Sequence, residues 1–193
     1  MQPAVPTDAI HAARLGSGWA FEGIYNALAG PVRRFLAAQG ASDPEASTQE
    51  AFLRVFRGID RFDGDSDHLR SWVFTVARNL LIDERRAAGR RPVPTIAPLP
   101  YRADARSQDD LVAGIEADQV RAILDRLPAD QREVVVLRFV VDRSLHEVAA
   151  VTGRSLAAVK GLQHRGLDRL RRLVEDPARS RAPFPVAQTF TST

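Results

Sequence analysis

The chain of 193 residues contains no cysteine, which excludes disulfide bonds, a thiolate nucleophile and cysteine-based zinc sites. Its four histidines, His11, His68, His146 and His164, lack the spacing of metal ligands. There is no run of about 18 apolar residues, and the N-terminus lacks the basic-then-apolar order of a signal peptide. We therefore expect a soluble, cytoplasmic protein with no membrane insertion, no metal ion and no cofactor.

Lysine is almost absent, because the 27 basic residues are 26 arginines and a single lysine, Lys160. Arginine suits contacts to phosphate and guanine, although a GC-rich genome would also enrich it. Residues 68–91 hold six arginines against two acids, and residues 154–172 hold six basic residues against one acid. Each block follows an acid-rich stretch. This pattern favours two separate contacts to an anionic partner, with solvated helix faces as the alternative.

Proline is concentrated in residues 89–110, where four prolines exclude a helix or a central strand. This stretch predicts a linker between two modules. The ends of the chain show no sustained period and are expected to be flexible. The resulting division is a flexible N-terminus over 1–16, a first domain over 17–90, a linker over 91–115, a second domain over 116–173 and a flexible tail over 174–193.

Apolar residues recur at helical spacing in both modules, and no segment alternates long enough to indicate a strand. The sequence therefore predicts an all-α protein of two small helical domains. In the first domain, Gly30-Pro31 is expected to end one helix and to start the next. The acid-rich stretch “RFDGDSD” is expected to be a loop, followed by a long helix that carries Trp72 on its apolar side.

The second domain ends in the order short helix, glycine turn, longer basic helix, which is typical of a helix-turn-helix. Ser144 and Glu147 have the spacing of a capping box. Gly153 lies where the chain must turn, and Ser155 is expected to cap the final helix.

On that final helix, “VKGLQHRGLDRLRRL”, the apolar residues form one stripe, which consists of Val159, Leu162, Gly166, Leu170 and Leu173. Lys160, His164 and Arg171 fall on a different face. A helix that packs on one side and carries polar and basic residues on the other fits the major groove of DNA. The alternative is an ordinary surface helix with basic side chains.

Two long stretches resemble one known family. “TQEAFLRVFRGIDRFDGDSDHLRSWVFTVARNLLIDERR” is similar to domain 2 of bacterial sigma factors of the extracytoplasmic-function (ECF, group 4) type. “LPADQREVVVLRFVVDRSLHEVAAVTGRSLAAVKGLQHRGLDRLRR” is similar to their domain 4. The resemblance implies a protein that binds core RNA polymerase, at the β′ coiled coil and the β flap, and directs it to promoter DNA. Domain 4 would read the −35 element as duplex, and domain 2 would capture the −10 element as a separated strand. An anti-sigma factor is a further candidate partner.

The resemblance and the helix faces together assign three sets of candidate residues. The −35 set lies on and just before the final helix: Arg154, Ser155, Ala158, Lys160, Gly161, Gln163, His164 and Arg165. The −10 set lies in the acidic loop and on the helix after it: Asp63, Asp65, Ser66, Asp67, His68, Arg70, Arg78, Asn79, Arg85 and Arg86. The polymerase set lies on “TQEAFLRVF”: Gln49, Glu50, Leu53, Arg54 and Arg57. Phe52, Phe56 and Trp72 are expected in the core.

The chain departs from the family pattern at two places. Ala46 and Ser47 stand where the family commonly has an acid and a leucine, which predicts a weaker edge of the polymerase contact. Gly161, Leu162 and Gln163 stand where it often has Ser-Arg-Leu, so a hydroxyl and an arginine contact are missing. Gln163 becomes a candidate for contact with adenine.

Two other classes of protein were weighed against a sigma factor. A stand-alone helix-turn-helix regulator would need a ligand-binding or receiver domain or a dimer interface, and no third domain is visible in the sequence. An enzyme is not expected, because no Cys-His pair, Ser-His-Asp set or glycine-rich phosphate loop is present.

Overall fold

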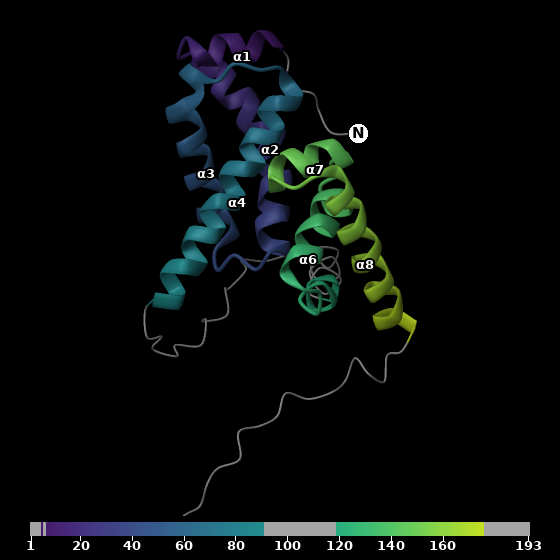
Figure 1. The fold of residues 1–193 in the computed structure, drawn as a ribbon. Helices are drawn as coiled ribbons and strands as arrows, with labels where there is room; N and C mark the ends of the chain where they lie inside the picture. Colours follow the sequence, from purple (N-terminus) through teal and green to yellow (C-terminus); the bar gives the residue numbers. More distant parts are fainter. Residues whose placement is uncertain (1–4, 6, 91–118, 176–193) are drawn as a thin grey trace, which may run out of the picture.

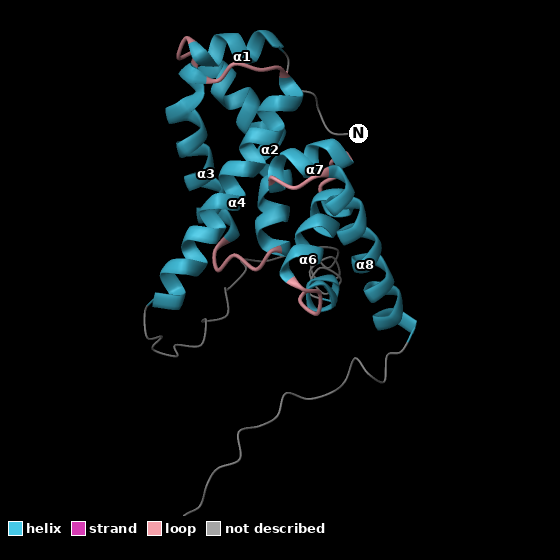
Figure 2. Ribbon diagram, viewed as in Figure 1, coloured by secondary structure: helices cyan, strands magenta, loops and turns pink. Residues whose placement is uncertain are grey.

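The computed structural model describes residue 5, residues 7–90 and residues 119–175, and all regular elements in these ranges are helices (Figures 1 and 2). The N-terminal lobe consists of α1 (Thr7–Arg14), α2 (Gly18–Ala38), α3 (Pro44–Gly58), the 3-10 turn η1 (Ile59–Arg61) and α4 (Ser66–Arg90). The C-terminal lobe consists of a helical segment over 119–124, α6 (Ala129–Val135), the π-helical turn η2 (Val136–Val140), α7 (Leu145–Thr152) and α8 (Leu156–Glu175). The all-α, two-domain prediction is confirmed.

The predicted linker over 91–115 lies outside the described residues. So does the predicted tail, apart from Val174 and Glu175, which end α8.

In the N-terminal lobe, α2, α3 and α4 form a bundle, and α1 lies across one end of it (Figure 1). Aromatic rings fill the centre, where Phe35 and Phe74 meet edge to face at 5.7 Å between ring centroids. Helix α3 begins where it does because the Asp43 carboxylate accepts hydrogen bonds from the backbone N–H groups of Glu45 and Ala46, at 3.1 and 3.0 Å. Pro44 occupies the first helical turn, where its missing N–H costs nothing.

The prediction of a helix break at Gly30-Pro31 is wrong. Helix α2 runs through both residues, with Pro31 inside it. A proline in a helix removes one backbone hydrogen bond and strains the preceding turn. Here Pro31 is itself buried, between the buried stripe residues Leu28 and Val32. Packing of this stripe against the bundle offsets the local cost, because most helical stability in a protein comes from tertiary contacts.

The assignment of residues 1–16 to a flexible N-terminus is also wrong for residues 7–14, which form α1. Ala9, Ile10 and Ala13 lie on one face of this helix and are buried, and Val5 is buried before it. The helix packs on α2 and η1. Three apolar residues over two turns form too short a pattern to distinguish a packed helix from a mobile end in the sequence alone.

The predicted helix-turn-helix is confirmed in its local chemistry. The Ser144 hydroxyl accepts a hydrogen bond from the Glu147 N–H at 3.2 Å, and the Glu147 carboxylate accepts one from the Ser144 N–H at 2.7 Å. Gly153 ends α7 with a φ of 66°, a left-handed conformation that glycine adopts without strain. The Ser155 hydroxyl then accepts a hydrogen bond from the Ala158 N–H at 3.2 Å and so caps α8.

The two lobes lie side by side (Figure 1), and one cluster of buried residues extends through both. Helix α7 lies against α4, and η2 lies against α2. At this boundary the side chain of Arg143 is only 4% exposed, and its guanidinium carbon lies 5.7 Å from the centre of the Phe74 ring. The same guanidinium donates to the Val141 carbonyl at 2.9 Å and to the Glu147 carboxylate at 3.1 Å. Its charge is therefore compensated where it leaves water.

Helices α6 and α8 approach each other closely at Gly166, where an added Cβ would lie 2.8 Å from Cγ2 of Val135. We expect Gly166→Ala to lower the free energy of unfolding by about 1–2 kcal/mol, because the gain in helix propensity is smaller than the cost of overpacking. The matched control is Gly161→Ala in the same helix, where the added Cβ would meet only the flexible Arg165 side chain. This control should stabilise the protein by about 0.5–1 kcal/mol in urea denaturation. Equal effects of both substitutions would contradict the close packing.

Candidate nucleic-acid and polymerase interface

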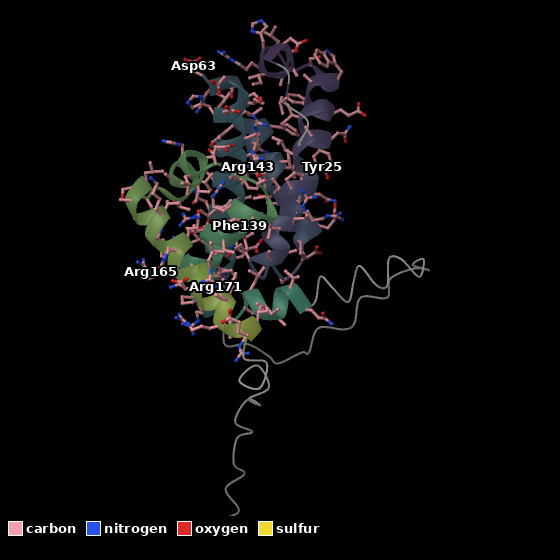
Figure 3. The ribbon with its side chains drawn as sticks, turned by 90° about the vertical axis from the view of Figure 1, so that its right-hand side faces the viewer. Tyr25, Asp63, Phe139, Arg143, Arg165 and Arg171 are labelled. Carbon is pink, nitrogen blue, oxygen red and sulfur yellow. The ribbon has the colours of Figure 1, made fainter. Side chains whose placement is uncertain are left out.

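Helix α8 has the two faces that its sequence predicts. Val159, Leu162 and Gly166 are buried against the rest of the lobe. Lys160, His164 and Arg165 are exposed on the opposite side. Figure 3 shows Arg165 and Arg171 on the outer side of this helix. The basic face of α8 is therefore open to a partner.

The turn before α8 adds to this face. Arg154, Ser155 and Ala158 are exposed, and the Ser155 cap fixes the direction in which the helix starts. Gly161 follows on the same side and has no side chain to cover the backbone; a Cβ added there would lie 3.2 Å from the Arg165 guanidinium. Small residues at the start of the helix would let it lie deep in a groove.

Gln163 is oriented differently from the exposed residues. It is partly buried, and its side-chain oxygen accepts a hydrogen bond from Nε of Arg138 on η2 at 3.3 Å. His164, by contrast, points outward, with Nδ1 3.1 Å from the Asp168 carboxylate. Contact between Gln163 and adenine would require the Arg138 bond to be given up.

The acidic loop is organised around Asp65, which caps α4. One oxygen of its carboxylate accepts hydrogen bonds from the N–H groups of Asp67 and His68, both at 3.0 Å, and contacts Nδ1 of His68 at 2.8 Å. These bonds, first among them the one from the His68 backbone, lower the pKa of the Asp65 carboxyl from its ordinary value of 3.8. An added Cβ at Gly64 would lie 2.8 Å from both His68 and Phe62, so the loop closes tightly on glycine.

The other predicted loop residues differ in their surroundings. Asp63 is exposed, at the end of the N-terminal lobe (Figure 3). Asp67 is exposed and pairs with Arg70. The hydroxyl of Ser66 is buried and has no hydrogen-bond partner within the described residues. The loop therefore presents Asp63, Asp65, Asp67 and His68 to solvent, and one oxygen of the exposed Asp65 carboxylate also fixes the shape of the loop.

Beside this loop the structure brings together an aromatic pair that the sequence analysis did not single out as a pair. The rings of Phe62 and Trp72 stack at 5.2 Å between centroids, with 13° between their planes. Both residues are partly exposed. Trp72 was expected in the core, and it is instead half-buried and packed against it. Ten residues separate Phe62 from Trp72 in the chain, so only the turn into α4 brings them together.

Two arginines of the −10 set, Arg78 and Arg85, are bonded to other elements of the protein. Arg78 forms an ion pair with Glu133 of α6, with Nε 2.6 Å from the carboxylate, and the two side chains are 22% and 13% exposed. Arg85 donates to the backbone carbonyl of Gln39. Asn79 and Arg86 are exposed on the same helix, and Arg86 lies 3.9 Å from Asp83. Glu133 was not foreseen from the sequence, because the contact spans 55 positions.

The polymerase set lies as predicted on the outer face of α3. Leu53 is 50% exposed, and Gln49, Arg54 and Arg57 are exposed, whereas Glu50 is partly exposed and bonds to Arg54 at 2.8 Å. Phe52 is buried, as expected, whereas Phe56, like Trp72, is partly buried and packed against the core.

The departure at Ser47 has a structural explanation. Ser47 is buried, and its hydroxyl donates to the Glu84 carboxylate of α4 at 3.0 Å. This residue joins α3 to α4. It is not part of the exposed face.

Two other features, a metal site and a membrane span, are absent from the described residues. No cluster of three or more His, Asp or Glu side chains there could hold a metal ion. None of the described helices combines the length and hydropathy needed to cross a bilayer.

The chain matches two family models, Sigma-70 region 2 over residues 21–91 and Sigma-70, region 4 over residues 123–172. One similar protein, the ECF RNA polymerase sigma factor BldN of Streptomyces coelicolor, is 33% identical over 190 residues, which span 92% of this chain and 71% of that protein. The ECF RNA polymerase sigma factor RpoE of Cereibacter sphaeroides is 31% identical over 79% of this chain and 84% of that protein. The solved structure of CnrH in complex with the cytosolic domain of CnrY superposes with a TM-score of 0.69 at 25% identity, over 89% of this chain and 97% of that one.

Two helical lobes, one carrying Sigma-70 region 2 and the other a region 4 helix-turn-helix, define the class of promoter-recognition proteins that serve RNA polymerase. Within that class, the chain belongs to the ECF RNA polymerase sigma factors. It therefore acts in transcription initiation, by binding core RNA polymerase and directing it to promoter DNA.

The lowered pKa of Asp65 predicts a change of stability with pH. A carboxyl whose pKa is lowered by folding contributes stability that is fully present above its unfolded pKa and is lost as the pH falls through its folded pKa. We expect Asp65→Asn to keep the helix cap but to flatten the dependence of the unfolding free energy on pH below about pH 4. Asp65→Ala should lose the cap at all pH values. Chemical denaturation from about pH 2 to pH 6 measures both, and an unaltered pH profile for Asp65→Asn would contradict the assignment.

The Arg78–Glu133 pair predicts a measurable coupling between the lobes. We expect Glu133→Gln to lower the free energy of unfolding by about 2 kcal/mol, because it leaves a half-buried guanidinium without its charge partner. A double-mutant cycle with Arg78→Met isolates the pair. The control is Glu45→Gln at the exposed pair with Arg33, where the expected cost is below about 0.5 kcal/mol. A coupling energy near zero would show that the pair does not join the lobes.

Proposed function

We propose that the C-terminal lobe, residues 116–173, reads the −35 element with the exposed face of α8. The observation that supports this most directly is the capped start of α8, with Lys160 and Arg165 exposed opposite the buried stripe. The major groove is about 12 Å wide and admits one helix, whose first turns meet the base edges. Lys160 and Arg165 contact phosphates, while Arg154, Ser155, Ala158, Gly161 and His164 line the approach to the bases. Gln163 also lines the approach to the bases once its hydrogen bond to Arg138 is broken.

Within the N-terminal lobe, residues 17–90 capture the −10 element as a separated strand. Its acidic loop carries hydrogen-bonding groups for the edge of an unstacked base, chiefly Asp63, Asp67 and His68, over a framework set by Asp65 and Ser66. The partly exposed Phe62–Trp72 stack lies beside them and offers a ring face for base stacking, which is worth about 1–3 kcal/mol per base. Arg70, Arg78, Asn79, Arg85 and Arg86 follow the backbone of the strand along α4.

Helix α3 docks on core RNA polymerase through Gln49, Glu50, Leu53, Arg54 and Arg57. The exposed Leu53 is flanked by charged residues, as in interfaces that have an apolar centre and a polar rim. The β′ coiled coil is the proposed partner of this face, and the β flap is the proposed partner of the C-terminal lobe. Catalysis belongs to the polymerase, and the protein works in the cytoplasm, where the chromosome and the polymerase are.

A polypeptide inhibitor of the anti-sigma type is part of the proposal. The similar chain CnrH was solved in complex with the cytosolic domain of CnrY, which supports a protein partner for the two-lobed arrangement. DNA binding along α4 also requires Arg78 to exchange Glu133 for a phosphate. The packed arrangement of the lobes is therefore a resting state, and promoter binding separates them.

The proposed −35 contacts are tested by Lys160→Ala and Arg165→Ala. Each should reduce binding to promoter duplex, and if each residue neutralises one phosphate, each should flatten the slope of log affinity against log salt by about 0.9. The control is Arg14→Ala on α1, which removes the same charge far from α8 and should leave the slope unchanged. A wild-type salt slope in both α8 variants would argue against phosphate contact.

The proposed function as a whole is tested by transcription in vitro with core RNA polymerase and the full chain, followed by mapping of the transcript 5′ ends. We expect specific start sites that depend on the added chain. If the chain instead bound specific duplex equally well without polymerase and yielded no transcripts, it would be a stand-alone regulator.

A further inference from the structure

A pocket of about 240 Å³ lies between the lobes, and nothing so far assigns a ligand to it. Three arginines line it, Arg78 and Arg85 from α4 and Arg154 from the turn before α8. Gln39, at the C-terminal end of α2, lines it as well. Two acids, Asp130 and Glu133, complete the charged residues of its wall.

The hydrogen-bond donors of this pocket exceed its free acceptors. Glu133 is occupied by Arg78, at 2.6 Å and 3.5 Å. One carboxylate oxygen of Asp130 accepts a hydrogen bond from the N–H of Gln131 at 2.8 Å. Arg85 donates one of the five N–H groups of its guanidinium to the Gln39 carbonyl, which leaves other N–H groups available as donors. Within the described parts of the chain, the guanidinium of Arg154 pairs with no carboxylate.

The strongest indication of a ligand comes from Gln39. The residue is only 3% exposed, and its side-chain nitrogen is buried with no hydrogen-bond partner among the described residues. A buried amide without a partner costs about 1–3 kcal/mol, so such a group is normally satisfied. Gln39 lines the pocket together with Arg85 and Arg154, and its side-chain nitrogen, as a donor, needs an acceptor as its partner.

We propose that this pocket binds a phosphate group, either as free phosphate or diphosphate or as the terminal group of a nucleotide. Arginine forks match the oxygens of phosphate, and the charge-assisted bonds are stronger than neutral ones. The donors converge from both lobes, which suits a tetrahedral oxyanion better than a planar carboxylate. The pocket is larger than the volume that one water molecule occupies in liquid water, about 30 Å³, so there is room for a polyatomic anion.

The bound anion would connect the two lobes, because Gln39 and Arg85 belong to one and Arg154 to the other. Arg85 and Arg154 are also proposed DNA contacts, so occupancy of the pocket and promoter binding would compete. That consequence depends on the proposed function. Binding of the anion does not, and it is measured without DNA or polymerase.

The test is isothermal titration of the full chain with orthophosphate and with pyrophosphate, in a chloride buffer of constant ionic strength. We expect saturable binding at one site for at least one of the two anions. Gln39→Leu and Arg154→Gln should each weaken it about tenfold or more, the usual effect of losing a hydrogen bond to a charged group. The control, Arg172→Gln, removes an exposed charge of α8 outside the pocket and should leave the affinity unchanged.

Nucleotides then distinguish the sources of the phosphate group. Tighter binding of ADP or GDP than of pyrophosphate would identify a nucleotide ligand, and equal or weaker binding would identify the free anion. No saturable binding of either inorganic anion would mean that water alone fills the pocket, and it would overturn the proposal. Equal loss of affinity in all three variants would overturn it too, because it would indicate a general effect of charge. If Gln39→Leu fails to fold by circular dichroism, the exposed Arg154→Gln decides the outcome.

Discussion

The packing of the two lobes depends on one buried guanidinium, that of Arg143. A charge removed from water is tolerated only where it is paired and hydrogen-bonded. Arg143 meets this condition through Glu147 and the Val141 carbonyl, while its flat face lies over Phe74 of the other lobe. Glu147 also closes the capping box of α7. The Glu147 carboxylate therefore caps the first helix of the helix-turn-helix. It also neutralises Arg143, the side chain that holds this helix against α4.

This arrangement explains why the predicted DNA contacts divide into two groups. The basic face of α8 is exposed, because α6 packs against the other face of this helix. Arg78 of α4 points toward the second lobe, because α7 lies against that helix and Glu133 of α6 pairs with the Arg78 guanidinium in place of a phosphate. In a protein that binds a polyanion, the arginines need other partners or solvent when the polyanion is absent. Here the second lobe provides the pairing for Arg78, and we propose that the pocket beside it recruits an anion for the same purpose.

The N-terminal lobe shows how local chemistry builds a recognition loop from few residues. Asp65 caps α4, and the hydrogen bonds that one of its carboxylate oxygens accepts lower its pKa, so its charge supports the shape of the loop. Gly64 allows the loop to close on His68 and Phe62. The result is a set of exposed polar groups next to the Phe62–Trp72 stack, a combination of edge contacts and ring face that suits an unstacked base.

Much of the fold could be predicted from local patterns. The capping box at Ser144, the glycine turn at Gly153 and the apolar stripe through Val159 and Leu162 depend on neighbours within a few positions, and the structure confirms them. The two errors had a common cause. The continuity of α2 through Pro31 and the packing of α1 depend on tertiary burial, which overrides propensity and is not visible in a short window.

The sequence by itself therefore determined most of the helices, the caps of the helix-turn-helix, the faces of α3 and α8, and the family to which the chain belongs. Only the tertiary structure decided which charges meet. Arg78 pairs with Glu133 across 55 positions, and Arg143 lies over Phe74 of the other lobe. The side-chain nitrogen of Gln39 is buried without a partner among the described residues, while its backbone carbonyl accepts from Arg85. The physical reason is that helix formation follows from contacts within three or four residues, whereas the pairing of buried charges depends on how whole helices pack.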